Sequence, residues 1–197
     1  MGTDKENIYD VYFLIGNFVG NVDYPVFGLD EIGKLNNEKK RAEKINARKL
    51  LAYAIKKSFG YNAVELDFKI SENGKPICDK LCFSLTHTEN AAAVICSDKP
   101  CGIDAEYLPN FFNKCADKSF IGRFLNRIGE NETLPEKEAL RLWTVKESVY
   151  KAGGTGGFSP KNVSGKNDKT KSFFIGDYVL SVTCENTEKI KLNVLNF

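Results

Sequence analysis

The 197-residue sequence has little of the residue types on which common metal and redox sites depend. His87 is its only histidine, and its six cysteines include no C-x-x-C pair. A zinc site with a histidine ligand would therefore have to include His87. Several of the cysteines lie in apolar runs, where a free thiol packs as a small hydrophobic group. This usage is typical of a reducing compartment, and we expect the protein in the cytoplasm.

The sequence also lacks long apolar runs and nucleotide-binding loops. Residues 1–7 are polar, and no apolar stretch approaches the length of a membrane span, so we expect no secretory signal and no membrane segment. The glycine-rich stretch 153–157 lacks the spacing and strand context of a P-loop or dinucleotide loop. The net charge of +2 is close to neutral and does not indicate a particular class of partner. We expect a monomer that binds neither nucleic acid nor membranes.

Two acidic residues stand near the middle of the chain, in Cys101-Gly102-Ile103-Asp104-Ala105-Glu106. Residues 91–96 just before them form an apolar run that is typical of a buried strand. Because side chains alternate along a strand, Asp104 and Glu106 would share one face, about 7 Å apart. Carboxylates so placed repel each other unless a cation lies between them, and Mg²⁺ is a suitable ion. The alternative is a strand end whose acids only meet water.

A basic helix is predicted before this stretch, from Asn36 or Asn37 to Phe59. Between residues 34 and 57 the sequence has nine basic and two acidic residues. Arg41, Lys44 and Arg48 lie at positions i, i+3 and i+7 and so share one helix face, close to the N-terminal half of the helix. Such a cluster indicates a polyanionic ligand, and the alternative is a solvated lysine-rich face.

A second long helix is predicted to begin near Pro135 and to end at Gly153-Gly154, with proline in its first turn. Trp143, Glu147 and Lys151 follow one another at four-residue steps and share a face. A carboxylate on the buried side of a helix must be paired, protonated or bound to a metal. The alternative is a simple Glu147–Lys151 ion pair.

The remaining elements are shorter. We expect His87 in a polar turn between two short strands, a loose stretch at 107–110 and a helix over 111–128. Strands are expected at 9–18, 64–70, 81–86, 91–96, 172–184 and 189–197, with a loop at 23–33 and a turn at 73–76.

Four motifs resemble, in order and spacing, those of 4′-phosphopantetheinyl transferases of the larger, surfactin-synthetase-activating type. They are Gly74-Lys75-Pro76, Phe83-Ser84-Leu85-Thr86-His87-Thr88, Gly102-Ile103-Asp104-Ala105-Glu106 and Trp143-Thr144-Val145-Lys146-Glu147-Ser148-Val149-Tyr150-Lys151. The resemblance spans roughly residues 38–157. Ser84 stands where the family usually has Asn, and Thr86 where it usually has Ser, and both keep a small hydrogen-bonding side chain.

The resemblance implies an α+β fold of two lobes related by a pseudo-twofold axis, each with a helix on a small antiparallel sheet. Residues 1–101 would form the lobe on the side of the coenzyme A 3′-phosphate. Residues 102–197 would form the lobe with the metal and the catalytic helix, and the two would make one compact unit.

The implied activity is that of a Mg²⁺-dependent holo-[acyl-carrier-protein] synthase. It would transfer 4′-phosphopantetheine from coenzyme A to a serine of an apo acyl or peptidyl carrier protein and release 3′,5′-ADP. The alternative is a non-catalytic module that binds coenzyme A or a carrier protein, and the presence of all three acids and Lys151 argues against it. A different Mg²⁺-dependent nucleotide enzyme is a further alternative, for which no signature is present.

The resemblance also implies roles for single residues. The Mg²⁺ ligands, with Mn²⁺ as a possible substitute, would be Asp104, Glu106 and Glu147. Glu147, Lys151 and Asp104 would be catalytic, with Glu147 taking the proton of the serine. Coenzyme A would contact Lys44, Arg48, Lys75, Pro76, Thr86, His87, Asp104, Glu147 and Lys151.

Overall fold

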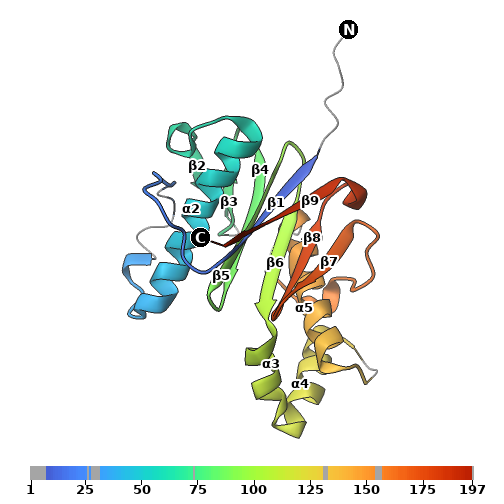
Figure 1. Cartoon of the computed structure of the whole chain (residues 1–197). Helices are drawn as coiled ribbons and strands as arrows, with labels where there is room; N and C mark the ends of the chain where they lie inside the picture. The colour runs from blue at the N-terminus through green and yellow to red at the C-terminus, as the bar shows by residue number, and fades with distance from the viewer. Residues whose placement is uncertain are drawn as a thin grey trace.

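Helices and small sheets alternate along the chain, which confirms the expected α+β class (Figure 1). The structure is a computed structural model that describes residues 8–25, 27, 32–72, 74–130, 133–153 and 157–196. The helices are α2 (Glu38–Phe59), α3 (Leu108–Cys115), α4 (Lys118–Ile128) and α5 (Glu136–Gly153). The strands are β1 (Tyr9–Ile15), β2 (Phe68–Ile70), β3 (Pro76–Cys78), β4 (Cys82–Thr88), β5 (Ala91–Ser97), β6 (Gly102–Tyr107), β7 (Thr170–Ile175), β8 (Tyr178–Thr183) and β9 (Ile190–Asn196). Single-turn 3₁₀ helices are η1 (Ala63–Glu65), η2 (Pro160–Asn162) and η3 (Thr187–Lys189).

The first lobe is built on a four-stranded sheet in the order β4-β5-β1-β9. Its strand β5 is buried along its whole length, because both faces of the sheet are covered. Val94 belongs to the core beneath α2, while its neighbours Ala93 and Ile95 belong to the core shared with the second lobe. An apolar strand without alternation is what burial on both faces requires.

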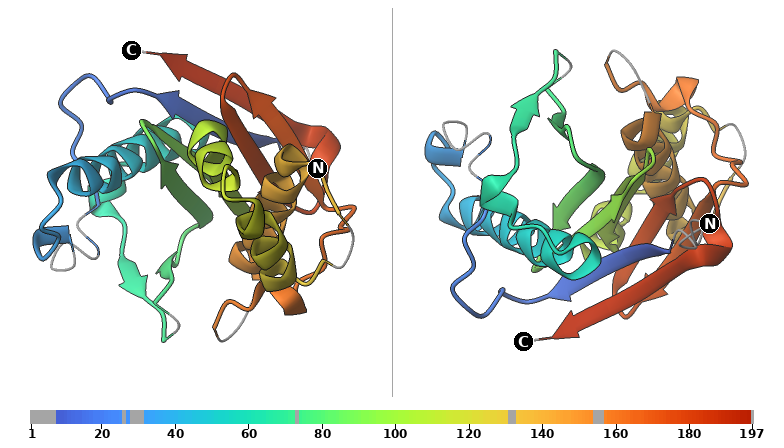
Figure 2. Two further views of the ribbon diagram at one scale, coloured as in Figure 1. Left: turned by 90° about the horizontal axis from the view of Figure 1, so that it is seen from below. Right: turned by 90° about the horizontal axis from the view of Figure 1, so that it is seen from above.

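The second lobe is a three-stranded antiparallel sheet in the order β6-β8-β7, with α5 against it. Ile103 and Ala105 of β6 and Leu180 of β8 pack onto the first sheet. The two sheets therefore lie face to face between the two long helices, as the end-on views of Figure 2 show. Asp104 and Glu106 point away from this shared core, as the alternation along β6 predicts.

The limits of α2 are set by its capping residues, and the predicted helix is confirmed. The Asn37 side chain accepts a hydrogen bond from the Lys40 backbone N–H, and Gly60 ends the helix with φ of 77°. Asparagine at the N-cap and a left-handed glycine after the last turn are the preferred ends of a helix.

Helix α5 lies unusually close to the second sheet. A Cβ on Gly102 would stand 1.9 Å from the backbone oxygen of Ser148, so only glycine fits there. Buried hydroxyl groups fill the rest of this interface: Thr144 Oγ1 lies 2.8 Å from Ser181 Oγ, and Ser148 Oγ lies 2.8 Å from Thr183 Oγ1. Helix and sheet are thus joined by hydrogen bonds as well as by packing.

Several expected elements differ from the structure. Only residues 68–70 of the expected 64–70 strand pair with a neighbour, and residues 63–65 form a 3₁₀ turn. The stretch 107–110, expected to be loose, ends β6 and begins α3, so the expected helix over 111–128 is two helices. His87 lies inside β4 and not in the turn after it. Residues 73 and 154, at the expected turn and helix end, lie outside the described residues.

The position of β9 differs from the expected division of the chain into two lobes at residue 101. It pairs in parallel with β1 and so completes the sheet of the first lobe, although it follows the second lobe in sequence. Among the described residues, no helix has both the length and the apolar character that crossing a bilayer requires.

Candidate active site

Four of the predicted residues meet at the junction of the two lobes. Asp104, only 4% exposed, accepts hydrogen bonds at Oδ1 from Thr86 Oγ1 at 3.1 Å and from Lys151 Nζ at 2.6 Å. The same Lys151 Nζ lies 3.3 Å from Glu147 Oε2. Strand β6 and helix α5 thus supply one acidic centre, defined here as Asp104, Glu106, Glu147 and Lys151, and Thr86 of β4 binds to it.

One oxygen of this centre is left without a partner among the described residues. Asp104 Oδ2 is buried and accepts no hydrogen bond. Buried polar atoms in folded proteins are almost always paired, and an orphan calls for a specific explanation. A cation bound to this oxygen would supply the missing interaction.

The carboxyl groups of the centre are in electrostatic conflict. Burial, and then the negative charges of Asp104 and Glu147, raises the pKa of Glu106 to about 7. Burial and the charge of Asp104 also raise the pKa of Glu147. Burial would lower the pKa of Lys151, but the charges of Asp104 and Glu147 outweigh that effect and raise it. Lys151 therefore stays protonated, and one ammonium faces three acids.

The predicted ligand set for Mg²⁺ fits this surplus of negative charge. Carboxylates are the protein groups that Mg²⁺ prefers, and one or two of them are usually enough. Within the described part of the chain, no three histidine, cysteine or acidic side chains are grouped closely enough to hold a metal ion by themselves. The set of Asp104, Glu106 and Glu147 thus stays a prediction, supported by the orphaned oxygen of Asp104.

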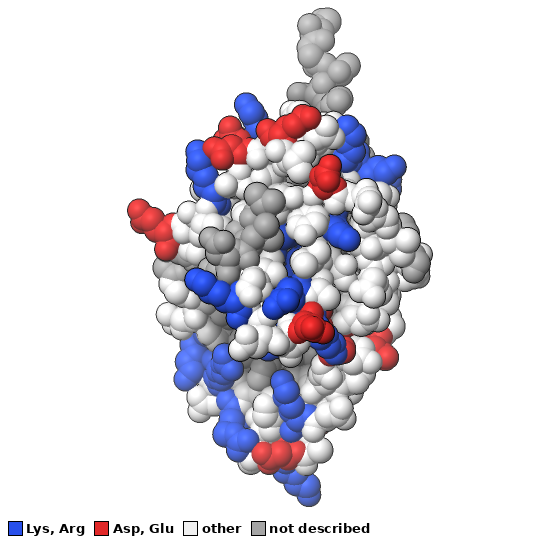
Figure 3. Space-filling model, turned by 90° about the vertical axis from the view of Figure 1, so that its left-hand side faces the viewer, with Lys and Arg blue, Asp and Glu red and all other residues white. Residues whose placement is uncertain are grey.

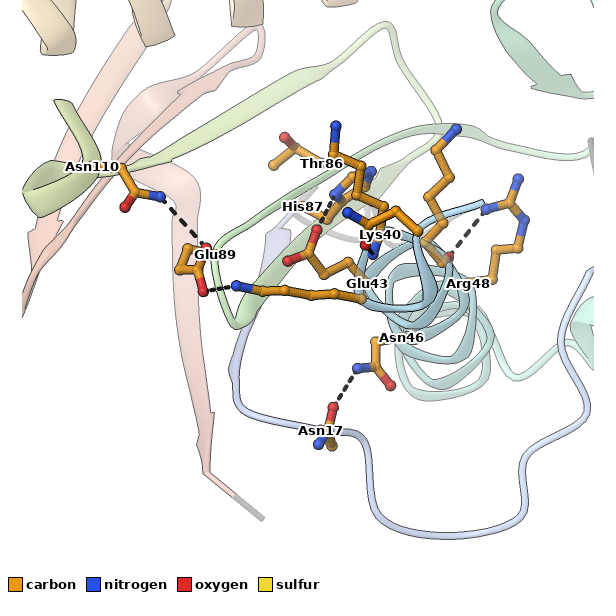
Figure 4. Close-up of polar contacts among 12 residues, drawn as sticks. Asn17, Lys40, Glu43, Asn46, Arg48, Thr86, His87, Glu89 and Asn110 are labelled. Atoms are coloured by element: carbon orange, nitrogen blue, oxygen red, sulfur yellow. Dashed lines mark hydrogen bonds and ion pairs between the residues drawn. The ribbon is translucent and has the colours of Figure 1, made fainter. Parts of the chain in front are cut away.

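Basic side chains surround His87 on the first lobe. Burial, and then the charges of Lys44 and Lys151, lowers the pKa of His87 to about 4. Its Nδ1 lies 3.6 Å from Glu43 Oε2, but an uncharged imidazole makes no ion pair at neutral pH. Figure 4 shows His87 facing α2, with Lys40 and Glu43 beside it. The face of the molecule that includes α2 carries gathered Lys and Arg side chains in its lower part (Figure 3).

Arg48 is more deeply buried than the other predicted phosphate ligands. It is 8% exposed, and its guanidinium donates to the backbone oxygens of Phe27 at 2.9 Å and Lys44 at 3.1 Å. It also lies 4.7 Å from the centre of the Phe27 ring. These contacts tie Arg48 to Phe27, and the contact of Arg48 with coenzyme A stays a prediction.

Lys75 and Pro76 line a pocket of about 460 Å³ between the lobes. Its other walls come from β4, including Ser84, and from the end of α5, including Tyr150 and Lys151. The Lys75 ammonium donates to the backbone oxygen of Lys151 and so links the two lobes beside the acidic centre. The pocket is large enough for part of a nucleotide-sized ligand.

Ser84 and Thr86, the two departures from the family pattern, both contact β6. Ser84 Oγ accepts from the Ile103 backbone N–H at 3.1 Å, and Thr86 bonds to Asp104. The substituted side chains therefore still tie β4 to the strand that carries the acidic centre. Thr86 acts on Asp104 itself, a role that the sequence did not reveal.

A polar link between the lobes was also missed. Glu89, in the turn after β4, pairs with Lys39 of α2 and lies 3.5 Å from Asn110 Nδ2 of α3 (Figure 4). Tyr178 of β8 donates to the Glu89 backbone oxygen at 3.0 Å. The partners come from three distant segments, and no local pattern could have pointed to them.

Comparison with known proteins agrees with this geometry. Residues 100–191 match the family described as the 4′-phosphopantetheinyl transferase superfamily. The match includes β6 and α5, the elements that carry the acidic centre. This match confirms the resemblance: residues 100–191 are similar to the 4′-phosphopantetheinyl transferase superfamily.

A particular relative is the 4′-phosphopantetheinyl transferase gsp of Aneurinibacillus migulanus. It is 31% identical to this chain over 99 residues. The alignment covers 48% of this chain and 41% of the relative, so this chain matches about two fifths of that protein's length.

Proposed function

We propose that this protein transfers the 4′-phosphopantetheine group from coenzyme A to a serine of an apo acyl or peptidyl carrier protein, releasing 3′,5′-ADP. The convergence of Asp104, Glu147 and Lys151 between the lobes carries the proposal, because phosphoryl transfer depends on positioning and charge neutralisation. The superfamily match over these residues supports it. The complete set of acids speaks against a non-catalytic binding module.

Asp104, Glu106 and Glu147 would hold a divalent cation, Mg²⁺ or Mn²⁺. When bound, such a cation neutralises charge on phosphoryl oxygens. Thr86 holds one oxygen of Asp104, which leaves the orphaned Oδ2 free to bind the ion. These three carboxylates are ligands of the kind that the proposed cation requires, and they lie beside the pocket that Lys75 lines.

Glu147 would take the proton of the attacking serine. Its pKa is raised by burial and by Asp104, which makes it a better base than an ordinary glutamate once it is ionised. Lys151, held by Asp104 and Glu147, supplies a fixed positive charge for the pyrophosphate. The nucleophile belongs to the carrier protein, so this chain needs none of its own.

Lys44, Lys75 and His87 would bind the phosphates of coenzyme A, with Arg48, Pro76 and Thr86 shaping the same site. His87 is uncharged at neutral pH, so it would contribute a hydrogen bond first. A neighbouring phosphate would raise its pKa and favour the charged form. The protein would act as a monomer in the cytoplasm on coenzyme A and an acidic carrier.

The test is an incubation with coenzyme A, Mg²⁺ and a panel of apo carrier proteins, followed by mass spectrometry of each carrier. The expected result is a gain of one phosphopantetheine on a serine of at least one carrier, dependent on coenzyme A and on the cation. Reactions with added chelator and with Asp104→Asn serve as controls. Tight binding of coenzyme A without any modified carrier would instead indicate the binding module.

A further inference from the structure

Lys146 is a buried cation in the middle of α5, only 3% exposed. Its Nζ donates to the backbone oxygens of Val163 at 2.7 Å and Pro160 at 3.3 Å, and it lies 3.4 Å from Glu130 Oε1. An ammonium group has three donors, and three acceptors surround this one. Although Lys146 directly precedes Glu147, it is therefore not available to a substrate phosphate.

The chain after α5 packs closely around this lysine. Gly165 lies against it, since a Cβ at that position would be 3.5 Å from Lys146 Cε and 3.0 Å from Leu142 Cδ2. Lys161 Nζ donates to Asn126 Oδ1 of α4 at 3.1 Å. Residues 160–165 are thus held between α4 and α5, with Lys146 at the centre of their contacts.

Two residues before Pro160, Phe158 lies against the face of α5 that carries Glu147. Its ring centre is 5.6 Å from that of Trp143 and 5.1 Å from that of Tyr150. Trp143, Glu147 and Tyr150 occupy positions i, i+4 and i+7, which share one helix face. Phe158 thus covers the two outer members of a row whose middle member is Glu147.

We propose that Lys146 is a positioning residue: by fixing residues 160–163 it seats Phe158 between Trp143 and Tyr150 and so closes one side of Glu147. Any displacement of these residues would take both carbonyl acceptors away from a buried ammonium, which is strongly unfavourable. The segment is therefore held in one place. The proposal rests on the proposed function only in its consequence for catalysis, because Glu147 is the proposed base.

Trp143 gives a direct readout, since it is the only tryptophan in the chain. Its fluorescence and its quenching by acrylamide report whether Phe158 still covers it, with no substrate present. We expect Lys146→Met, which keeps the volume and removes the charge, to shift the emission to longer wavelength and to increase quenching. Phe158→Ala should give the same change, and adding Lys146→Met to Phe158→Ala should produce no further increase.

Lys137→Met is the matched control, an exposed lysine on the first turns of the same helix, and it should leave quenching unchanged. Far-UV circular dichroism establishes that each variant is folded. Wild-type quenching in folded Lys146→Met would overturn the proposal. If that variant does not fold, Lys146→Gln decides, since its shorter, uncharged side chain no longer holds both carbonyl oxygens: increased quenching supports the proposal and wild-type quenching overturns it.

The catalytic consequence is measured separately. In the transfer assay, Lys146→Met and Phe158→Ala should both lower kcat by roughly ten- to a hundredfold, with little change in the KM for coenzyme A. A purely stabilising lysine would lower the melting temperature while kcat of the folded enzyme stayed at the wild-type value. If the wild-type protein transfers nothing, the proposed function fails, while the fluorescence result still decides the positioning role.

Discussion

The backbone of Ser148 touches Gly102 so closely that a methyl group at Gly102 would stand 1.9 Å from the Ser148 oxygen and 2.6 Å from the Ala152 nitrogen. This close approach fixes how deep α5 lies on β6. Asp104 follows two residues after Gly102, and Glu147 directly precedes Ser148. The absence of a side chain at Gly102 therefore sets the distance between Asp104 and Glu147.

Gly102→Ala should force α5 away from β6. Overpacking of this kind typically costs about 3 kcal/mol, because backbone cannot yield as a flexible side chain can. We expect a lower midpoint in urea unfolding and a loss of transfer activity. Gly122→Ala is the control, because Gly122 lies in α4 with no atom within 4 Å of its added Cβ. That change should keep or slightly raise stability, since alanine favours helices. Equal midpoints for the two variants would contradict the close approach.

Asp104→Asn should lower kcat by roughly a hundred- to a thousandfold, because an amide keeps the shape but not the charge that a cation needs. The fold should survive, since Lys151 retains Glu147 as a partner. Differential scanning fluorimetry with and without Mg²⁺ checks the reason. The wild type should be stabilised by the cation and the variant should not. A variant still stabilised to the wild-type extent would place the cation elsewhere.

Glu106 should make the metal-free protein less stable as the pH rises from about 4.5 to 7. The folded-state pKa of Glu106, about 7, lies above its ordinary value of 4.5. The native state therefore binds more protons than the unfolded state between these values, so the stability that Glu106 contributes is lost across this range and is gone above about pH 7. His87 acts in the opposite sense at lower pH: its pKa of about 4 lies below 6.5, so its contribution is lost between pH 6.5 and 4.

Thermal melts of Glu106→Gln test this assignment. As the pH rises from 4.5 to 7, the melting temperature of the variant should rise relative to that of the wild type, and the variant should keep the decline in acid that His87 causes. In the wild type, Mg²⁺ should stabilise more at pH 8 than at pH 6, because Glu106 must be ionised to bind it. A difference between the melting temperatures of variant and wild type that stays constant from pH 4.5 to 7 would assign the effect to another group.

Dephospho-coenzyme A, which lacks the 3′-phosphate, should bind less tightly than coenzyme A, by about tenfold for each charged hydrogen bond that the 3′-phosphate would accept. His87→Ala should reduce the difference in affinity between coenzyme A and dephospho-coenzyme A. High salt should weaken coenzyme A binding, because charges on both partners are screened. Titration calorimetry with both ligands measures this difference in affinity. Lys99→Ala, which removes a lysine paired with Glu185, should leave it unchanged. Equal losses of affinity for both ligands in His87→Ala would show that His87 does not contact the 3′-phosphate.

The sequence was sufficient where the determinants are local. Asn37 and Gly60 mark the ends of α2, and the alternation of β6 places Asp104 and Glu106 on one face. Pro109 was misread because proline suggests a loop, yet it occupies the first turn of α3, where its missing N–H costs nothing.

Other features depend on partners that are far away in sequence. Residues 64–66 alternate like a strand, but only 68–70 find a partner in β3. In the sequence, Lys146 looks like any charged residue of a helix. Its role becomes clear only from its hydrogen bonds to the backbone oxygens of Pro160 and Val163. No periodicity of α5 could have shown that this lysine is buried.

The parallel pairing of β9 with β1 affects how the protein is made. Asn193 and Val11, joined by a hydrogen bond, are 182 residues apart. During synthesis, one edge of β1 stays unpaired until nearly all of the described chain has left the ribosome. Closing so long a loop is slow, and an open edge invites pairing with other chains. Strand β9 thus covers the buried strand β1 and takes its place as the edge of the first sheet.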